Sequence, residues 1–253
     1  MQTVQVEKDG AVGVVTMCKP PHNLMSMGSL ADLATALQAA VDAGSRSILL
    51  RSSMRHFCAG ADLQVIYEER PSAEKLQSLW SQFEDIQVPV VAAVHGAALG
   101  GGLELALMCD MIIAADTATF AMAETTLGLL PLLGGAQRIA QRVGPARAKE
   151  LAMFGRRHGP QALERWGVIN LVTPEQELAA VSLSWVRQLA AGPTVAYRGI
   201  KMLVDTAARD GVKAADARQH EANDWMWQSK DRERGLAAFA QTGRPATAAF
   251  EGN

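Results

Sequence analysis

A glycine triplet followed by a carboxylate is the feature of this sequence best suited to chemistry. Gly100, Gly101 and Gly102 precede residues 103–109, a segment of helix-forming residues with an apolar face. The first N–H groups of a helix have no partner within the helix, and its N-terminus favours negative charge. If the helix begins at Gly101, Glu104 lies in its first turn, on the same face as the glycine amide. One site would then hold an anion-stabilising amide and a carboxylate.

On spacing alone, a purely structural explanation of the triplet is supported as well as a catalytic one. Three glycines before a helix also permit tight packing of strand against helix, with Glu104 exposed to solvent. The triplet does not match the dinucleotide-binding fingerprint, because its third glycine comes too early and no acidic residue about 20 positions on ends a second strand.

A second loop, at residues 59–61, also consists of small residues against which a ligand could lie. Asp62, which follows this loop, could cap a helix that begins near Leu63. Cys58 and His56 are two positions apart and would face the same side of an extended segment, as a thiolate nucleophile and its base require. We favour the alternative of a buried structural cysteine, because free cysteines are among the most buried residues. His95, at a strand end, is likewise typical of a packed, hydrogen-bonded histidine.

Glu124 is the second carboxylate of interest. It lies among apolar and β-prone residues, with Met122 before it and Leu127 after it. This context predicts partial burial, where a carboxylate needs a partner or acquires a raised pKa. The alternative is a carboxylate at a helix start, since Thr125 and Thr126 favour a turn.

The elements that must position these residues follow from hydrophobic periodicity. Residues 3–7 and 11–17 read as an edge hairpin turning at Asp9-Gly10. Further strands are expected at 47–52, 90–94, 111–115 and 168–172, and helices at 26–43, 72–87, 135–143, 145–154 and 161–166. Alternation of strand and helix predicts parallel pairing in an α/β layer, which by itself suggests a doubly wound sheet. Residues 175–241 have a helical pattern, with breaks at Gly192-Pro193 and Asp210-Gly211.

Composition excludes several classes of protein. The 253 residues are 49% hydrophobic and 20% charged, which is ordinary for a globular protein. With 24 basic and 26 acidic residues the net charge is −2, so nucleic acid and anionic membranes are not expected partners. Neither a transmembrane-length run nor a signal-peptide pattern is present, and a cytoplasmic location is therefore expected. The three cysteines form neither a disulfide framework nor a metal-binding spacing.

Five segments occur in an order and at separations that resemble the crotonase, or enoyl-CoA hydratase/isomerase, superfamily over nearly the whole chain. They are FCAGADL, HGAALGGGLELALMCD, AETTLGLLPLLGGAQRI, the GRR at 155–157 and WGVINLV. The resemblance implies an α/β fold built as a spiral of ββα turns, in place of a doubly wound sheet. It also implies a core at residues 1–190 with the acyl-CoA site, and a C-terminal helical region at 191–253 that forms trimers or dimers of trimers.

The resemblance also assigns roles to site residues. The backbone N–H groups of Ala61 and Gly101 would form an oxyanion hole for an acyl-CoA thioester. Glu104 would activate water and Glu124 would supply the α-proton, as in enoyl-CoA hydratases, without a metal or redox cofactor and with coenzyme A as part of the substrate. The expected substrate-binding residues are Asn23, Leu24, Arg55, Ala59, Ala61, Asp62, Leu63, Gly101 and Leu132. Leu132 departs from the family pattern, in which glycine follows the proline, and its side chain would narrow the acyl pocket or make it more apolar.

Four functions are compatible with these residues. The sequence favours an enoyl-CoA hydratase, a lyase acting on 2-enoyl-CoA thioesters. A 3,2-enoyl-CoA isomerase or another crotonase-family enzyme needs only one acid/base near Glu124. A non-catalytic acyl-CoA-binding subunit would not need the pair formed with Glu104. A cysteine hydrolase would depend on Cys58.

Overall fold

A computed structural model describes residues 3–244 and 248–253 of the chain, and its centre is a six-stranded sheet. The strands lie in the order β1-β2-β3-β4-β6-β8. Their bounds are Val4–Asp9 for β1, Val12–Met17 for β2, Ser47–Ser52 for β3, Val90–Val94 for β4, Met111–Ala115 for β6 and Leu171–Thr173 for β8. β1 and β2 form the antiparallel hairpin expected at the edge, and every later pairing is parallel. The α/β layer is therefore confirmed.

A second sheet separates this fold from a doubly wound one. It consists of β5 (Ala97–Leu99) and β7 (Thr119–Ala121), which pair in parallel. The chain passes from β4 to β5 before it enters α4 (Gly101–Leu107), which makes a ββα turn, and it passes from β6 to β7 in the same way. Gly96, at φ 60°, lies at the bend between the two sheets, a conformation that favours glycine. Strand and helix alternation did not reveal these short strands.

The helices that pack around the sheets begin and end close to where the sequence predicts. Their bounds are Met27–Asp42 for α1, Leu63–Glu69 for α2, Ala73–Glu84 for α3, Gly135–Val143 for α5, Pro145–Phe154 for α6, Pro160–Arg165 for α7 and Leu178–Ala190 for α8, with short 3₁₀ turns η1 (Glu124–Leu127) and η2 (Glu175–Glu177). Ser26 caps α1 by accepting a hydrogen bond from Ser29 N. The predicted stripe on α1, which includes Leu30, Leu33 and Leu37, is buried in the core.

The last strand is shorter than its apolar pattern predicts. Val168 and Ile169 are buried, but their N–H groups donate to Leu163 O, which closes the end of α7. These two amides are thus unavailable to the sheet, and β8 begins only at Leu171. The prediction of one strand over residues 168–172 rested on their apolar side chains, which do not show where their N–H groups bind.

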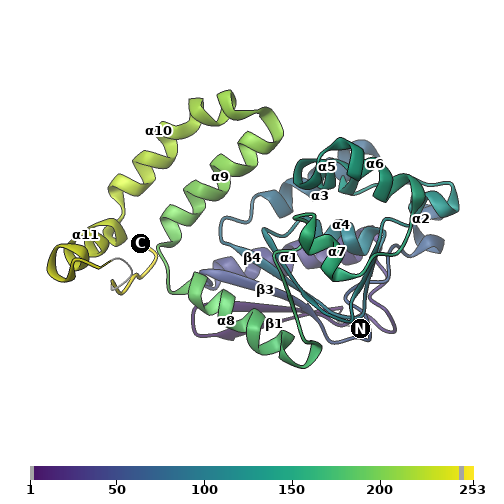
Figure 1. The fold of residues 1–253 in the computed structure, drawn as a ribbon, viewed down its shortest axis with the longest axis horizontal. Helices are drawn as coiled ribbons and strands as arrows, with labels where there is room; N and C mark the ends of the chain where they lie inside the picture. The colour runs from purple at the N-terminus through teal and green to yellow at the C-terminus, as the bar shows by residue number, and fades with distance from the viewer. Residues whose placement is uncertain (1–2, 245–247) are drawn as a thin grey trace.

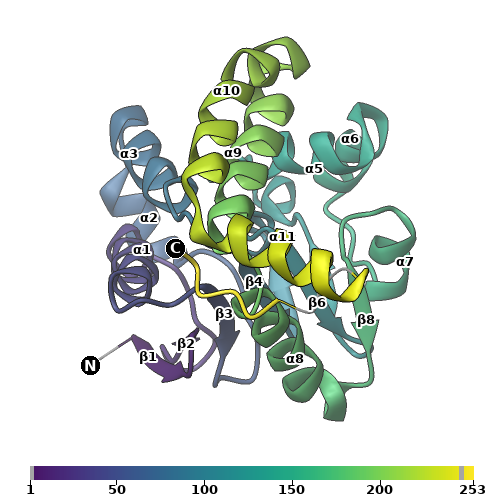
Figure 2. The same ribbon diagram turned by 90° about the vertical axis from the view of Figure 1, so that its left-hand side faces the viewer.

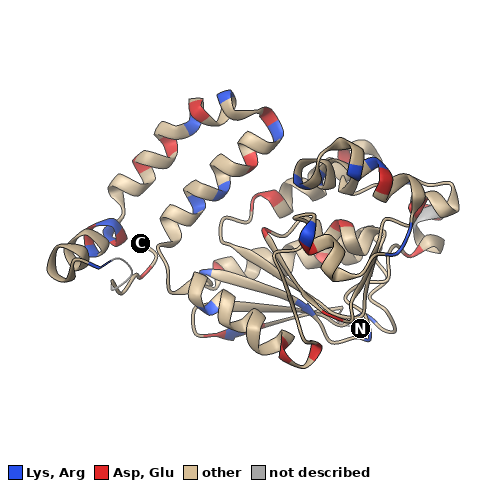
Figure 3. Cartoon of the chain, in the orientation of Figure 1, with Lys and Arg blue, Asp and Glu red and all other residues tan. Residues whose placement is uncertain are grey.

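The C-terminal part of the chain is helical, as expected. It consists of α9 (Thr194–Asp210), α10 (Val212–Gln228) and α11 (Lys230–Thr242). α9 and α10 run as an adjacent pair, and α11 follows at the end of this pair opposite the turn between α9 and α10 (Figures 1 and 2). Basic and acidic residues are interspersed along these helices (Figure 3). The break at Ser229, between α10 and α11, was not predicted.

Large apolar side chains are exposed on this C-terminal region. Trp227, Leu236 and Phe239 are each more than half exposed in the single chain.

α9 is tied to the core by Lys201, whose Nζ lies 2.9 Å from Asp110 Oδ2. The division at residue 190 into core and assembly region stays a prediction. Within the described residues, no helix is long and apolar enough to cross a membrane.

Candidate active site

The glycine triplet occupies the strand-to-helix turn where the sequence places it. Gly100 has φ 51° and donates its N–H to Ala121 O, and α4 begins at Gly101. Gly102 serves close packing, because a Cβ there would lie 2.2 Å from Cys58 O. Gly101 faces a different environment: a Cβ there would lie 2.7 Å from Met25 Cε and 3.9 Å from Ala61 N. Both explanations of the triplet therefore apply, each to a different glycine.

The amides of Ala61 and Gly101 approach each other from two loops. Met25 N donates to Gly60 O and Asp62 N donates to Met25 O, so the loop that carries Ala61 is fixed on both sides. In the described part of the chain, neither the Ala61 N–H nor the Gly101 N–H has an acceptor. These two donors are available to an oxygen atom placed between the loops.

Glu104 is buried, which excludes the interpretation that places it in solvent. The residue is only 2% exposed. Its Oε1 accepts hydrogen bonds from Leu133 N at 2.9 Å and Gly135 N at 2.8 Å. Oε2 faces Gly101, at 3.9 Å from the position of a Cβ there. The pKa of Glu104 is raised to about 7, because burial, and to a smaller extent the charge of nearby Glu124, outweigh the opposing effect of the amides.

Glu124 begins η1 and directs its carboxylate toward the same turn. Its Oε1 lies 3.1 Å from the position that a Cβ on Gly100 would occupy. Both carboxylate oxygens are buried without a hydrogen-bond partner among the described residues. Burial raises the pKa of Glu124. A buried, unpartnered carboxylate is costly to stability, so it marks a place where a ligand or water would be bound.

A cavity of about 240 Å³ connects the two glutamates. Apart from them its lining is almost wholly apolar and is rich in leucine, including Leu129, Leu130 and Leu132. The two hydroxyls that line it are already engaged. Ser26 caps α1, and Thr126 Oγ1 donates to Ala123 O. The cavity thus joins a pair of acids to an apolar pocket.

The expected substrate-binding residues fall into two groups. Ala59, Ala61, Leu63, Gly101 and Leu132 line the cavity. The other four, Asn23, Leu24, Arg55 and Asp62, lie outside its lining.

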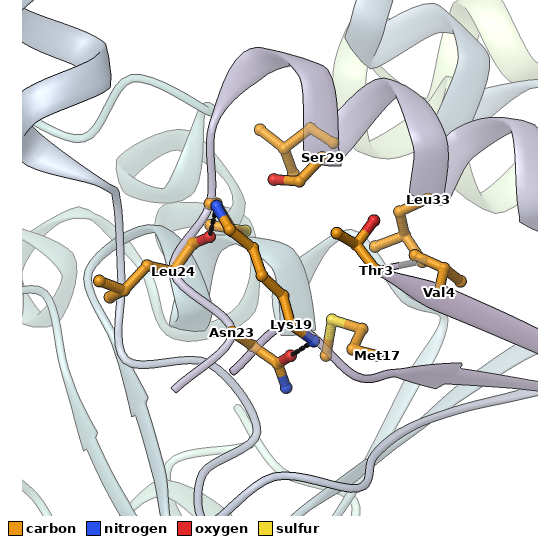
Figure 4. Close-up of a pocket in the computed structure, with 10 residues that line it drawn as sticks. Thr3, Val4, Met17, Lys19, Asn23, Leu24, Ser29 and Leu33 are labelled. Carbon is orange, nitrogen blue, oxygen red and sulfur yellow. Dashed lines mark hydrogen bonds between the residues drawn. The ribbon is translucent and has the colours of Figure 1, made fainter. Parts of the chain in front are cut away.

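Asn23 has a structural role that the sequence did not reveal. The residue is buried at φ 53°, its Oδ1 accepts from Lys19 N, and its Nδ2 donates to Ser52 Oγ and Phe57 O. Lys19 Nζ in turn donates to Leu24 O, as seen in a second, much smaller pocket (Figure 4). The Asn23 side chain therefore holds two loops together, and a ligand could meet only the backbone here.

The remaining two predicted residues lie near this junction. Arg55 is exposed on the loop after β3. Asp62 Oδ2 lies 3.8 Å from Lys19 Nζ, so its carboxylate is partly neutralised.

Cys58 is not a nucleophile in this structure. Its thiol is fully buried and donates to Asn23 O at 3.1 Å, and burial raises its pKa to about 12. Burial also lowers the pKa of His56, followed by the effect of nearby His22, which disfavours a thiolate–imidazolium pair. His95 Nε2 is hydrogen bonded to Met54 O, as expected of a packed histidine. The structure contradicts the cysteine hydrolase hypothesis.

The described residues contain no group of three or more His, Cys, Asp or Glu placed to hold a metal ion.

Comparison with known proteins identifies the family of this chain. The sequence model of the enoyl-CoA hydratase/isomerase family matches residues 7–251. The chain belongs to this family. A probable enoyl-CoA hydratase of Mycobacterium bovis is 32% identical over 96% of this chain and 97% of its own length. A 2,3-dehydroadipyl-CoA hydratase of Escherichia coli is 29% identical over 97% and 98% of the two chains.

Solved structures of the family have the same fold. An enoyl-CoA hydratase subunit from Geobacillus kaustophilus superposes with a TM-score of 0.90 at 31% identity, covering 100% of this chain and 99% of the other. The crotonase-type spiral of ββα turns with a C-terminal helical region is therefore confirmed.

The sequence did not reveal the partners of Glu104. The glycines at 134 and 135 were expected to start a helix, and Gly134 does cap α5 at φ 76°. Their helix-start pattern was the available signal for outward-facing amides. Which carboxylate those amides would meet depends on how α5 packs against α4.

Proposed function

We propose that the protein is an enoyl-CoA hydratase, which adds water across the 2,3 double bond of a 2-enoyl-CoA thioester. One observation carries the proposal: Glu104 and Glu124 line a single cavity, beside two backbone N–H groups that have no acceptor among the described residues. The cavity thereby offers donors to a thioester oxygen and two carboxyl groups to a water molecule. The apolar lining suits the acyl chain.

The amides of Ala61 and Gly101 form the proposed oxyanion hole. Addition to the enoyl thioester moves negative charge onto the carbonyl oxygen as an enolate forms. Fixed donors, one of them at the N-terminus of α4, stabilise this charge more than they stabilise the neutral carbonyl. In other enzymes the loss of one such donor costs about 2.7–4 kcal/mol.

The two glutamates divide the proton transfers. Oε1 of Glu104 already accepts two N–H groups, so Oε2 is the atom that takes a proton from water. The water oxygen bonds to Cβ as Glu104 takes its proton. The π pair of the Cα–Cβ double bond then joins Cα to the carbonyl carbon, the carbonyl π pair moves onto the thioester oxygen, and Glu124 in its acid form delivers a proton to Cα as the carbonyl is restored. Burial raises the pKa of both carboxyl groups, that of Glu104 to about 7, and the split of roles describes the coupled pair.

Coenzyme A enters as part of the substrate, and the proposed reaction uses no metal or redox cofactor. Its pantetheine arm would run along the loop of Ala59, Ala61, Asp62 and Leu63. The nucleotide would contact Arg55 and the backbone of residues 23–24, since the Asn23 side chain is engaged within the protein.

A second candidate, a 3,2-enoyl-CoA isomerase, is favoured by one observation. The amides of Leu133 and Gly135 hold Glu104, whereas both oxygens of Glu124 lack hydrogen-bond partners within residues 3–244 and 248–253. If the amides give Glu104 a structural role, Glu124 alone could shuttle a proton between Cα and Cγ. A non-catalytic acyl-CoA-binding subunit is disfavoured, because simple binding gives no reason to bury two unneutralised carboxyl groups.

The experiment is a spectroscopic assay with 2-enoyl-CoA and 3-enoyl-CoA thioesters, followed by product analysis. A hydratase converts the 2-enoyl substrate to a 3-hydroxyacyl-CoA. Interconversion of the two enoyl substrates without hydration would identify an isomerase, and tight acyl-CoA binding without turnover would identify a binding subunit.

A further inference from the structure

Arg138 links the loop that holds Glu104 to the surface of the protein. Its guanidinium lies on α5, and Nη1 donates to Leu133 O at 3.2 Å and Gly134 O at 3.4 Å. Nη2 donates to Glu84 Oε1 at 3.0 Å. The Arg138 side chain is only 19% exposed, so its contacts with the two carbonyls are partly shielded from water, whereas the Glu84 side chain is 47% exposed.

The carbonyl that Arg138 holds belongs to the same peptide group as an amide that holds Glu104. Gly134 O and the Gly135 N–H lie in one planar unit and point in opposite directions. Arg138 contacts the oxygen side of this unit, and Glu104 Oε1 accepts from its nitrogen side. The peptide is flanked by two glycines, and residues without Cβ oppose a peptide rotation least. The backbone N–H of Arg138 also donates to Gly134 O, at 3.1 Å, so Arg138 holds this peptide through its backbone as well as through its guanidinium.

We propose that Arg138 is a positioning residue, which keeps the Gly134–Gly135 peptide turned so that its N–H stays on Glu104. The effect of this positioning on catalysis rests on the proposed hydratase function. With the peptide held, Oε1 of Glu104 is occupied and Oε2 faces the cavity.

Arg138 is itself held by elements outside the cavity. Glu84 ends α3, and its other oxygen lies 3.6 Å from Arg209 Nη1 on α9. Gln141 Nε2, one turn along α5 from Arg138, donates to Ala208 O of the same α9 helix. The C-terminal helices thus support the orientation of α5, and through Arg138 they support the loop at Glu104.

Loss of Arg138 has a defined electrostatic result. The amides of Gly135 and Leu133 oppose the burial of Glu104 and the charge of Glu124, which both raise its pKa. Without the guanidinium, Gly134 O keeps only its bond from Arg138 N and Leu133 O loses its contact with Nη1, which loosens the loop that carries the amides, so we expect the pKa of Glu104 to rise. The carboxylate form is then rarer at neutral pH, and turnover falls while the apolar contacts to the acyl chain remain.

The test compares Arg138→Met, Arg138→Lys and Glu84→Gln with the wild type. Arg147→Met is the matched control, because Arg147 pairs with Glu150 on α6 and contacts Trp166, away from the 133–135 loop. Two readouts are needed: the pH dependence of kcat and KM for crotonyl-CoA hydration, and a ¹³C-carboxyl NMR titration of Glu104, assigned with Glu104→Gln. Circular dichroism verifies that each variant is folded.

We expect Arg138→Met to raise the pKa of Glu104 by about one unit, which lowers kcat about fivefold at neutral pH. KM should change little, and the loss should shrink at high pH, where the carboxylate is restored. Lysine keeps the charge without the fork that reaches two carbonyls and Glu84, so Arg138→Lys should show a shift of the same sign. Glu84→Gln should give a smaller shift in the pKa of Glu104, and Arg147→Met should give no shift.

An unchanged Glu104 titration in folded Arg138→Met or Glu84→Gln overturns the inference, as does an Arg138→Lys variant that titrates like the wild type. Loss of activity by the same factor at every pH also contradicts it, because that result indicates a purely structural role. The NMR readout does not depend on turnover. If the wild type fails to hydrate enoyl thioesters, the proposed function fails while the positioning role of Arg138 is still tested.

Discussion

Gly135 donates its backbone N–H to Oε1 of Glu104 at 2.8 Å, across 31 positions of sequence. This bond leaves the second oxygen of the carboxylate to face the cavity. Glu104→Gln keeps an acceptor for the amide but removes the capacity to take a proton. We expect Glu104→Gln and Glu124→Gln each to lower hydration by about 10²–10⁴-fold, with acyl-CoA binding nearly intact. Stopped-flow or steady-state hydration assays, with calorimetry for binding, provide the check. Near-wild-type turnover in either variant would reject the two-glutamate mechanism.

The buried state of Glu104 also makes stability depend on pH. Its pKa is raised from 4.5 to about 7, so between these values the folded protein keeps a proton that the unfolded chain has released. The free energy of unfolding therefore falls as pH rises through this window. The associated stability, about 3 kcal/mol, is fully present below the lower value and lost above the upper one.

Urea unfolding of wild type and Glu104→Gln at a series of pH values measures this effect. The stability of the variant relative to the wild type should increase from about pH 4.5 to about pH 7. A difference that stays constant over that range would mean that Glu104 is not protonated in the folded protein.

The oxyanion hole is tested at Gly101, because its donors are backbone amides. Gly101→Pro removes one N–H and fixes φ at a value compatible with the first position of α4. A folded protein with activity reduced at least about 10²-fold is expected. Gly101→Ala is the control: it keeps the N–H, and its Cβ would crowd the flexible end of Met25 at 2.7 Å while lying at ordinary contact distance, 3.9 Å, from Ala61 N and Glu104 Oε2. If the proline variant is folded and fully active, Gly101 is not an oxyanion donor.

Leu132 occupies a position where the family usually has glycine, and its side chain lines the acyl pocket. Leu132→Ala removes apolar surface that only longer acyl chains reach. We expect its kcat/KM for 2-octenoyl-CoA to fall about tenfold more than for crotonyl-CoA, given about 0.8 kcal/mol per buried methylene. An equal loss on both substrates would place Leu132 away from the acyl chain.

The exposed apolar residues of α10 and α11 predict assembly into a trimer or hexamer. Trp227, Leu236 and Phe239 present more apolar surface than an isolated helix pair leaves in water. Light scattering at micromolar concentration should report a trimer or a dimer of trimers, and Leu236→Asp with Phe239→Asp should reduce its mass. Val6→Asp, which alters an exposed apolar residue on β1, is the control. A monomeric wild type would refute the prediction.

The sequence by itself determined the local elements and several residues of the site. Periodic apolar residues place α1 and β4 within a residue or so of their predicted ends, because the face that a helix or strand buries is encoded in its own spacing. The glycines at 100–102 identified a helix start, since backbone without Cβ is required there by local geometry. The resemblance of five ordered segments then selected the spiral over a doubly wound sheet.

Tertiary structure alone decided which groups meet. No local pattern indicates that Glu104 accepts hydrogen bonds from the amides of Leu133 and Gly135. Nor does any local pattern indicate that the Asn23 side chain holds two loops together. Arg138 gave no signal either, because its partners come from different elements of the chain. Such contacts depend on the packing of α4, α5 and α3 around the sheets. Packing sums many weak, long-range interactions, so the protonation of a buried carboxylate follows from the folded arrangement and not from the residue's neighbours in sequence.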